Sequence, residues 1–176
     1  MKRKTRIDFI TAICLILCGS IILISPSIKY LNVKLVLLLI LTFYGIINLL
    51  QFVLTNKAKD FEGLFTMIAS IISLILLGIL DIDTKPLNLA LVLFVWISIM
   101  SLIKLKKADY YHDRNKKIWM LRIVTLIIFV ISGLLSVINL YYEPEVQILV
   151  LGFFYLIHGI LELMDPLTNY LIDEKK

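Results

Sequence analysis

Six apolar stretches, separated by short polar connections, form the dominant pattern in this chain. They cover residues 7–24, 35–54, 64–80, 87–103, 118–140 and 146–164. A helix that spans a bilayer needs about 20 mostly apolar residues, so each stretch is predicted to be a transmembrane helix, the third and fourth being short. The longest connection, residues 104–117, leaves no room for a soluble domain. The pattern predicts an all-α integral membrane protein with six transmembrane helices in one domain, residues 1–176.

The six stretches form three predicted helical hairpins that resemble one another. These hairpins cover residues 7–54, 64–103 and 118–164. In each, a glycine in the first helix precedes a proline near the turn, the pairs being Gly19 with Pro26, Gly78 with Pro86, and Gly133 with Pro144. All four prolines, including Pro166, are expected in turns or beyond a helix end. Because each hairpin begins and ends on the same side, we expect parallel repeats in a compact bundle with approximate threefold similarity.

Each second helix carries a related motif, in which a small residue precedes two apolar residues, a polar residue and leucine. The small residues are Gly45, Ser98 and Gly159, and the polar slot is filled by Asn48, Ser101 and Glu162. Small residues let transmembrane helices approach closely, and polar side chains between them contribute about 0.6 kcal/mol on average. We interpret the polar slot as interhelical hydrogen bonding, with a polar vestibule open to the cytoplasm as the functional alternative.

Three copies of the glycine, the proline and the small-x-x-polar motif resemble the HdeD-like membrane proteins, a family named after a bacterial acid-resistance protein. The resemblance covers essentially the whole chain. It implies a six-helix inner-membrane protein, linked through its founding member to survival in acid, and it brings no catalytic residues to carry over. The middle repeat departs from the pattern, since Ser98 stands where the outer repeats have glycine, so strictly threefold packing is not expected.

Composition and charge agree with a membrane protein and predict its orientation. The chain is 60% hydrophobic and 18% charged, which is too little polar surface for a soluble domain of this length. Fourteen Lys and Arg residues fall on one predicted side, and three, Lys29, Lys34 and Lys85, on the other. Cytoplasmic loops carry the excess of such residues, so we predict a multi-pass protein of the plasma (inner) membrane with both termini cytoplasmic. A second span follows the first, which predicts a retained helix rather than a signal peptide.

Four ionisable residues of the predicted spans form a candidate intramembrane polar cluster: Asp8, Arg122, His158 and Glu162. A charge at mid-bilayer costs about 2.5–3.5 kcal/mol on insertion scales, so such residues point to function. All but His158 fall toward the cytoplasmic interface, and Asp8 and Arg122 each stand eleven residues before their repeat glycine. They are predicted either to form a buried ionic cluster or, more simply, to snorkel to headgroups and water.

His158 and Glu162 lie one helical turn apart and share a helix face. Such a pair is compatible with a metal site or a proton relay, but catalytic zinc usually takes three protein ligands. His112 lies in the basic connection, and Cys14 and Cys18 lie in a different helix. We therefore expect no metal and interpret His158 as a core histidine that is hydrogen-bonded to a neighbouring helix, with pH sensing as the alternative.

Residues 106–117 combine basic side chains with tyrosines at the predicted inner surface. The segment is interpreted mainly as a topology determinant and also as a candidate site for anionic lipid, each cation contributing on the order of 1 kcal/mol. It is too short to form a nucleic-acid-binding fold, and protein partners, including a homo-oligomer, stay open.

The function predicted from these observations is that of a non-enzymatic, HdeD-like membrane protein without a cofactor, which supports acid or stress tolerance. The sequence has no phosphate-binding loop, Ser/His/Asp set or paired acidic motif. The first alternative is a small channel or transporter for protons or a small solute. The second is a membrane-embedded enzyme.

Overall fold

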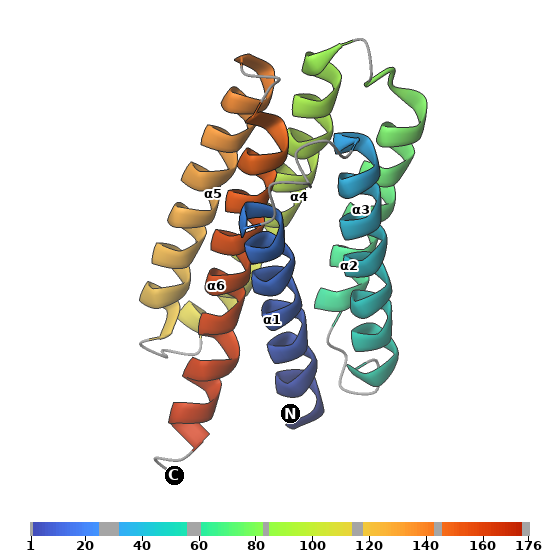
Figure 1. Cartoon of the computed structure of the whole chain (residues 1–176). Coiled ribbons are helices and arrows are strands. Elements are labelled where there is room, and N and C mark those ends of the chain that lie inside the picture. Colours follow the sequence, from blue (N-terminus) through green and yellow to red (C-terminus); the bar gives the residue numbers. More distant parts are fainter. Residues whose placement is uncertain are drawn as a thin grey trace.

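The computed structural model describes residues 2–24, 32–55, 61–82, 85–113, 118–142 and 146–173, which form six helices joined by short connections. The helices (Figure 1) are α1 (Lys2–Ile24), α2 (Val33–Thr55), α3 (Glu62–Ile79), α4 (Pro86–Asp113), α5 (Ile118–Tyr142) and α6 (Gln147–Asp173). Each contains a segment of 18 to 24 residues that is long and apolar enough to cross a membrane. The described chain is therefore all-α with six candidate transmembrane helices, as the hydrophobic pattern predicts.

Large apolar side chains cover the outward faces of the helices. Ile24 and Ile79 are 80% and 76% exposed, and Val53 and Leu102 are both 64% exposed. Soluble monomers rarely expose contiguous apolar surface on this scale, whereas a helix satisfies its own backbone hydrogen bonds and tolerates hydrocarbon around it. The outward faces fit the interior of a bilayer, and the chain is a multi-pass membrane protein.

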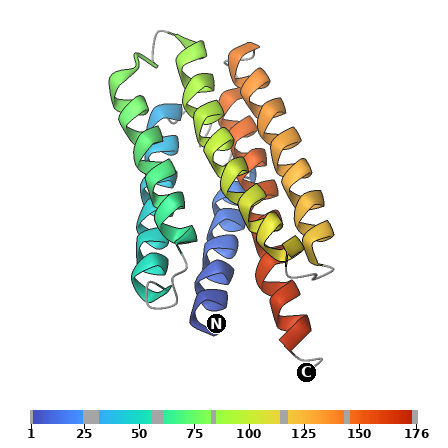
Figure 2. The ribbon, with the colours of Figure 1, turned by 180° about the vertical axis from the view of Figure 1, so that it is seen from behind.

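The helices are arranged as a ring in chain order, with α1 closing the ring against α6. Figures 1 and 2, taken from opposite directions, show α1 and α4 on opposite sides of the bundle. The most extensive packing joins α1 to α6, α4 to α5 and α2 to α3, whereas α1 and α2 pack least. The closest pairs thus lie between the predicted hairpins rather than within them, and the hairpin repeat is not confirmed.

The α1–α6 pair is held together by glycines at which the two backbones touch. A Cβ atom added to Gly19 would lie 2.5 Å from the backbone nitrogen of Leu156, and one added to Gly159 would lie 2.7 Å from that of Ile16. Both distances are shorter than real Cβ contacts, so only glycine fits without a backbone shift. At Gly78, an added Cβ would meet no atom within 4 Å. The predicted repeat anchors therefore differ, because Gly19 is a packing residue and Gly78 is not.

Three helices extend by several residues beyond the apolar stretches that predict them, and one of them is α1, which begins at Lys2 and not at residue 7. α4 continues past residue 103 to Asp113, and α6 continues past residue 164 to Asp173. With 28 residues, α4 is about 42 Å long, which exceeds the hydrocarbon thickness of about 30 Å. Hydropathy detects only the part of a helix that matches hydrocarbon, so it places polar terminal turns in the connections. Lys104 and Lys107 consequently lie on a helix and not in a loop.

The prolines occupy two kinds of position. Pro86 begins α4, where the missing N–H group is not needed. Pro166 lies inside α6, so the prediction that it lies beyond a helix end is wrong. Its ring removes the donor that would reach the carbonyl of Glu162, four residues earlier. Pro26 and Pro144 lie outside the described residues.

Both chain ends lie at the same end of the bundle (Figure 1). The last turns of α2, α4 and α6 and the first turns of α1, α3 and α5 meet there, because consecutive helices alternate in direction. This end is called the terminal end below. The two sites described below, each with polar side chains in its lining, lie at or near this end.

Candidate functional site

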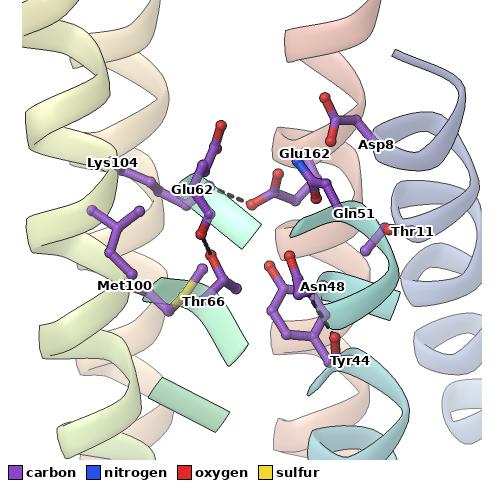
Figure 3. A pocket seen from close by; sticks show the side chains of 11 residues that line it. Asp8, Thr11, Tyr44, Asn48, Gln51, Glu62, Thr66, Met100, Lys104 and Glu162 are labelled. Atoms are coloured by element: carbon purple, nitrogen blue, oxygen red, sulfur yellow. Dashed lines mark hydrogen bonds and ion pairs between the residues drawn. The ribbon is translucent and has the colours of Figure 1, made fainter. Parts of the chain in front are cut away.

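A small polar pocket lies inside the ring near the terminal end. Five helices line it with Asp8, Thr11, Tyr44, Asn48, Gln51, Glu62, Thr66, Met100, Ile103, Lys104 and Glu162. Figure 3 shows these side chains pointing toward one another from α1, α2, α3, α4 and α6. The cavity volume is about 20 Å³, enough for one water molecule. We call this site the polar pocket.

An ion pair between Lys104 and Glu162 crosses the polar pocket (Figure 3). It joins α4 to α6, which are not neighbours in the ring, so the pair spans the interior of the bundle. The Lys104 and Glu162 side chains are only 18% and 16% exposed. The Lys104 ammonium also lies 5.2 Å from the centroid of the Phe129 ring on α5, within cation–π range. One lysine therefore connects α4 with α5 and α6.

A second ion pair joins α4 to α3. Lys107 Nζ donates to Glu62 Oε1 at 2.6 Å, and both side chains are partly buried. Glu62 also accepts a hydrogen bond through its backbone oxygen from the hydroxyl of Thr66, at 2.9 Å. Lys104 and Lys107, three residues apart on α4, thus bind carboxylates on two different helices.

His158 lies inward of the polar pocket and is completely buried. Four aromatic rings surround it, with centroid distances of 5.9 Å to Tyr44, 5.3 Å to Trp96, 5.0 Å to Phe129 and 6.0 Å to Phe154. These rings come from α2, α4, α5 and α6, so the centre of the bundle is filled. We call His158 and these four rings the aromatic plug.

The imidazole of His158 has an unusual environment for a buried polar group. Its Nε2 lies 3.8 Å from Glu162 Oε1, beyond hydrogen-bond length. Within the part of the chain that the structure describes, neither ring nitrogen has a hydrogen-bond partner. The expected hydrogen bond to a neighbouring helix is therefore not formed with any described residue. His158 and Glu162 share a helix face, as their spacing indicates, but aromatic rings hold the histidine in place.

The predicted polar slot divides into two kinds of residue. Asn48 lines the polar pocket, yet its Nδ2 donates to the backbone oxygen of Tyr44 on its own helix, at 2.8 Å. Ser101 donates to the oxygen of Ile97, also on its own helix, at 2.7 Å, and is not among the residues lining the pocket. Glu162 makes an interhelical contact, with Lys104. These hydrogen bonds of Asn48 and Ser101 thus stay within one helix.

The remaining two members of the candidate cluster lie apart. Asp8 lines the polar pocket together with Glu162, so these two carboxylates, expected at similar depth in the membrane, lie at one site. Arg122 is buried on α5 but is not among the lining residues. Its burial, with 5% exposure, argues against snorkelling to open water. Of the repeat-equivalent pair, the acid faces the pocket and the base does not.

Several residues of the site escaped the sequence analysis, notably Lys104 and Gln51. Each stands six residues after the small residue of its motif, Ser98 and Gly45 respectively, one turn beyond the polar slot. A reading of the motif extended by one turn would have found both. Lys104 lies just past the fourth apolar stretch, which ends at residue 103, so hydropathy places it with the basic connection and not with the motif.

No group of three or more His, Cys, Asp or Glu residues placed to hold a metal ion occurs within residues 2–173 as far as they are described. Cys14 and Cys18 are free and half-buried on α1. The polar pocket instead offers three carboxylates, a lysine, amides and hydroxyls, a set suited to holding water and protons.

Comparison with known protein families, curated proteins and solved structures finds no match for this chain. The resemblance to HdeD-like proteins therefore stays a prediction that rests on the motifs.

Proposed function

We propose that this chain is a non-enzymatic membrane protein of the HdeD-like kind that supports acid or stress tolerance, with Glu162 as its proton-responsive group. The observation that carries the proposal is the Lys104–Glu162 pair, a partly buried ion pair across the inside of a helix ring. The repeat motifs supply the physiological expectation. The six apolar helices support the placement in a membrane.

Acid acts on this pair through the charge of the carboxylate. Protonation of Glu162 leaves Lys104 charged in a mostly closed interior, and removing one partner of a buried pair is costly. The connection between α4 and α6 then weakens, and so does the packing around it. Glu162 lines the polar pocket, which has room for a water molecule that can deliver the proton to the carboxylate. A partner protein or the bilayer would respond to the altered packing.

The three-hairpin repeat belongs to the same proposal. Tyr44, Ile97 and His158 each precede the small residue of their motif, and all three are buried. Extensive and sparse helix contacts alternate around the ring, as three related units would produce. These observations support three units whose strongest contacts are made with one another.

The orientation in the plasma (inner) membrane is also part of the proposal. The excess of Lys and Arg at the terminal end supports cytoplasmic termini. After replacement of Cys14 and Cys18, a cysteine at position 145 should react with an impermeant thiol reagent added outside cells, and one at position 115 should not. Both positions lie outside the described residues. The opposite labelling would reverse the orientation.

Acid survival of a deletion strain tests the physiological role. Wild type should restore survival, and Glu162→Gln, which cannot change its charge, should restore it poorly at equal membrane abundance. Asp113→Asn is a matched control, because this exposed carboxylate does not line the polar pocket. Failure of the wild type to rescue would remove acid tolerance from the proposal. Equal rescue by Glu162→Gln would remove Glu162 from it.

A proton channel or small-solute transporter is the second candidate. Glu162 lines the polar pocket and also lies 3.8 Å from His158. This arrangement favours transport, since the carboxylate and the imidazole form the start of a proton path. Against it, the aromatic plug fills the centre, and Arg122 is not among the residues lining the pocket. Transport therefore requires the plug to move.

Proton flux separates the two candidates. Proteoliposomes with a pH-sensitive dye inside should show no flux above empty vesicles if the protein acts without transport. A flux that disappears in Glu162→Gln and persists in Asp113→Asn would make the transporter the better proposal.

A further inference from the structure

A second cavity lies at the terminal end, between the last turns of α4 and the first turns of α5. Its volume is about 360 Å³, and it shares no lining residue with the polar pocket. The polar members of its lining are Lys106, Asp109, His112 and Trp119. We call this site the interfacial groove. Its volume falls within the range of small-molecule sites in proteins.

The interfacial groove is amphipathic along its length. Leu105, Ala108 and Ile123 supply its apolar lining, and it lies where α4 passes the end of its apolar span at Tyr110. Trp119, which lines the groove, is of the residue type that favours the membrane–water interface. The groove thus joins hydrocarbon on one side to the aqueous headgroup region on the other, which is the position of a lipid rather than of a soluble ligand.

Two side chains of opposite charge lie close together in the described lining of the groove. Lys106 and Asp109, both exposed, stand three residues apart on α4, which places their Cβ atoms about 5–6 Å apart. Lys104 and Lys107 do not add to the groove, because they pair with Glu162 and Glu62 inside the ring. The described lining therefore offers one cation and one anion side by side.

We propose that the interfacial groove binds a phospholipid with a zwitterionic aminoethyl phosphate headgroup, phosphatidylethanolamine. The lipid phosphate accepts hydrogen bonds from Lys106, and the lipid ammonium donates to the carboxylate of Asp109. The acyl chain near the headgroup packs on the apolar lining. This site is independent of the acid response proposed for Glu162.

The choice of headgroup follows from the paired charges. Phosphatidylcholine carries a trimethylated ammonium that has no N–H group for Asp109. Phosphatidylglycerol has no cation, so Asp109 would face an anionic headgroup without compensation. The sequence alone predicts anionic lipid for residues 106–117 as a segment, on the basis of their cations, and that stays a prediction. The zwitterionic occupant is proposed for the groove lined by Lys106 and Asp109.

A ring pair closes one side of the groove. His112 and Trp119 lie edge to face, with centroids 5.0 Å apart and an interplanar angle of 88°. The pair joins the end of α4 to the start of α5, so the groove wall is built from both helices. Trp119 also provides a spectroscopic reporter within the site. The other tryptophan, Trp96, is buried in the aromatic plug, away from lipid.

Quenching of tryptophan fluorescence by brominated lipids tests the proposal. The full chain is reconstituted in phosphatidylcholine vesicles that contain the same mole fraction of brominated phosphatidylethanolamine, phosphatidylcholine or phosphatidylglycerol. The Trp119→Phe variant supplies the signal of Trp96, which is subtracted. We expect the affinity of the groove beside Trp119 for brominated phosphatidylethanolamine to be about fivefold higher than for brominated phosphatidylcholine, since one added charge contact contributes free energy of this order.

Matched variants identify the groups responsible. Asp109→Asn should abolish the preference for phosphatidylethanolamine over phosphatidylcholine, whereas Asp113→Asn, an exposed neighbour outside the lining, should keep it. Equal quenching by the three lipids, or a preference for phosphatidylglycerol, would overturn the proposal. Soluble glycerophosphoethanolamine should not displace the lipid; displacement would mean that the groove binds free headgroups instead.

Discussion

Helix α1 has two sides of opposite character. Toward α6 its backbone touches the neighbouring backbone at Gly19 and Gly159, with no side chain between them. Toward α2 its packing is sparse, and the side chains of Asp8 and Thr11 face the polar pocket together with Asn48 of α2. The same helix thus forms both the tightest and the loosest contact in the ring.

The two sides of α1 are expected to have different roles, one stabilising the bundle and the other allowing movement. Close backbone packing depends on glycine and leaves no space for water, so the α1–α6 side stabilises the bundle. The α1–α2 side has fewer apolar contacts to lose and holds polar groups, and such regions open at low free-energy cost. We therefore expect movement at the α1–α2 side, around the polar pocket, while the α1–α6 side stays closed.

The largest effect is expected where α1 meets α6. Gly19→Leu would place a large side chain where even a Cβ would lie 2.5 Å from backbone, so it should destabilise the protein by at least about 3 kcal/mol. Gly78→Leu is the matched control, because the space around Gly78 is open. Unfolding in a denaturing detergent, followed by circular dichroism, measures both. Similar stability of the two variants would contradict the close packing of α1 on α6.

An intermediate effect is expected in the polar pocket. Lys104→Leu leaves Glu162 without this cation in a mostly closed site, which should cost about 2 kcal/mol. The double variant Lys104→Leu with Glu162→Leu should regain most of that loss, since neither member of the pair is then left without the other. The same unfolding assay measures the recovery. A double variant as unstable as the sum of the two single ones would mean that the pair is not energetically coupled.

A smaller effect of opposite sign is expected at the aromatic plug. His158→Phe replaces one ring by another of similar size and removes two buried nitrogens that have no described hydrogen-bond partner. The variant should be more stable by about 1 kcal/mol. Loss of stability would show that the imidazole is satisfied by a group such as water. If the variant is stable but fails the acid-survival assay, the histidine acts in the response.

The smallest effect is expected on the open side of α1. The Thr11 hydroxyl donates to the oxygen of Ile7 on its own helix, at 2.9 Å, so it adds little to the contact between helices. Thr11→Val should therefore change stability by less than about 0.5 kcal/mol. A loss as large as that of Lys104→Leu would mean that α1 and α2 are joined more firmly than their sparse packing indicates.

Sequence alone predicted where the helices lie in the chain better than it predicted which helices pack together. Four of the six apolar stretches fall within their helices, and the third and sixth overrun by one residue each, at Leu80 and Val146. The first stretch and the membrane-compatible part of α1 both cover Ile7–Ile24. The pairing of helices was not accessible, because small residues show that a helix is approached closely without showing by which partner. Gly19 and Gly78 look equivalent in the chain, yet one touches α6 and the other faces open space.

Sequence alone predicted the depth of the site residues but not which of them meet. Depth in the membrane follows from position in a span, which is why Asp8 and Glu162 were expected at one level, and both line the polar pocket. Which cation meets Glu162 depends on rotation of the helices about their axes and on the true end of α4. Lys104 lies past the apolar stretch, so hydropathy gives no reason to expect it inside the bundle. It is nevertheless the residue that forms the ion pair with Glu162.

The closure of the ring by α1 and α6 has a consequence for biosynthesis. Gly19 and its neighbour Gly152 are 133 residues apart in the chain, and ribosomes add about 5–20 residues per second. For roughly 7–27 seconds, α1 is therefore in the membrane without the surface that it will eventually contact. Its glycine face is available during that interval to an insertion factor or to the wrong helix, so the speed of translation and the presence of such a factor bear directly on the yield of correctly assembled protein.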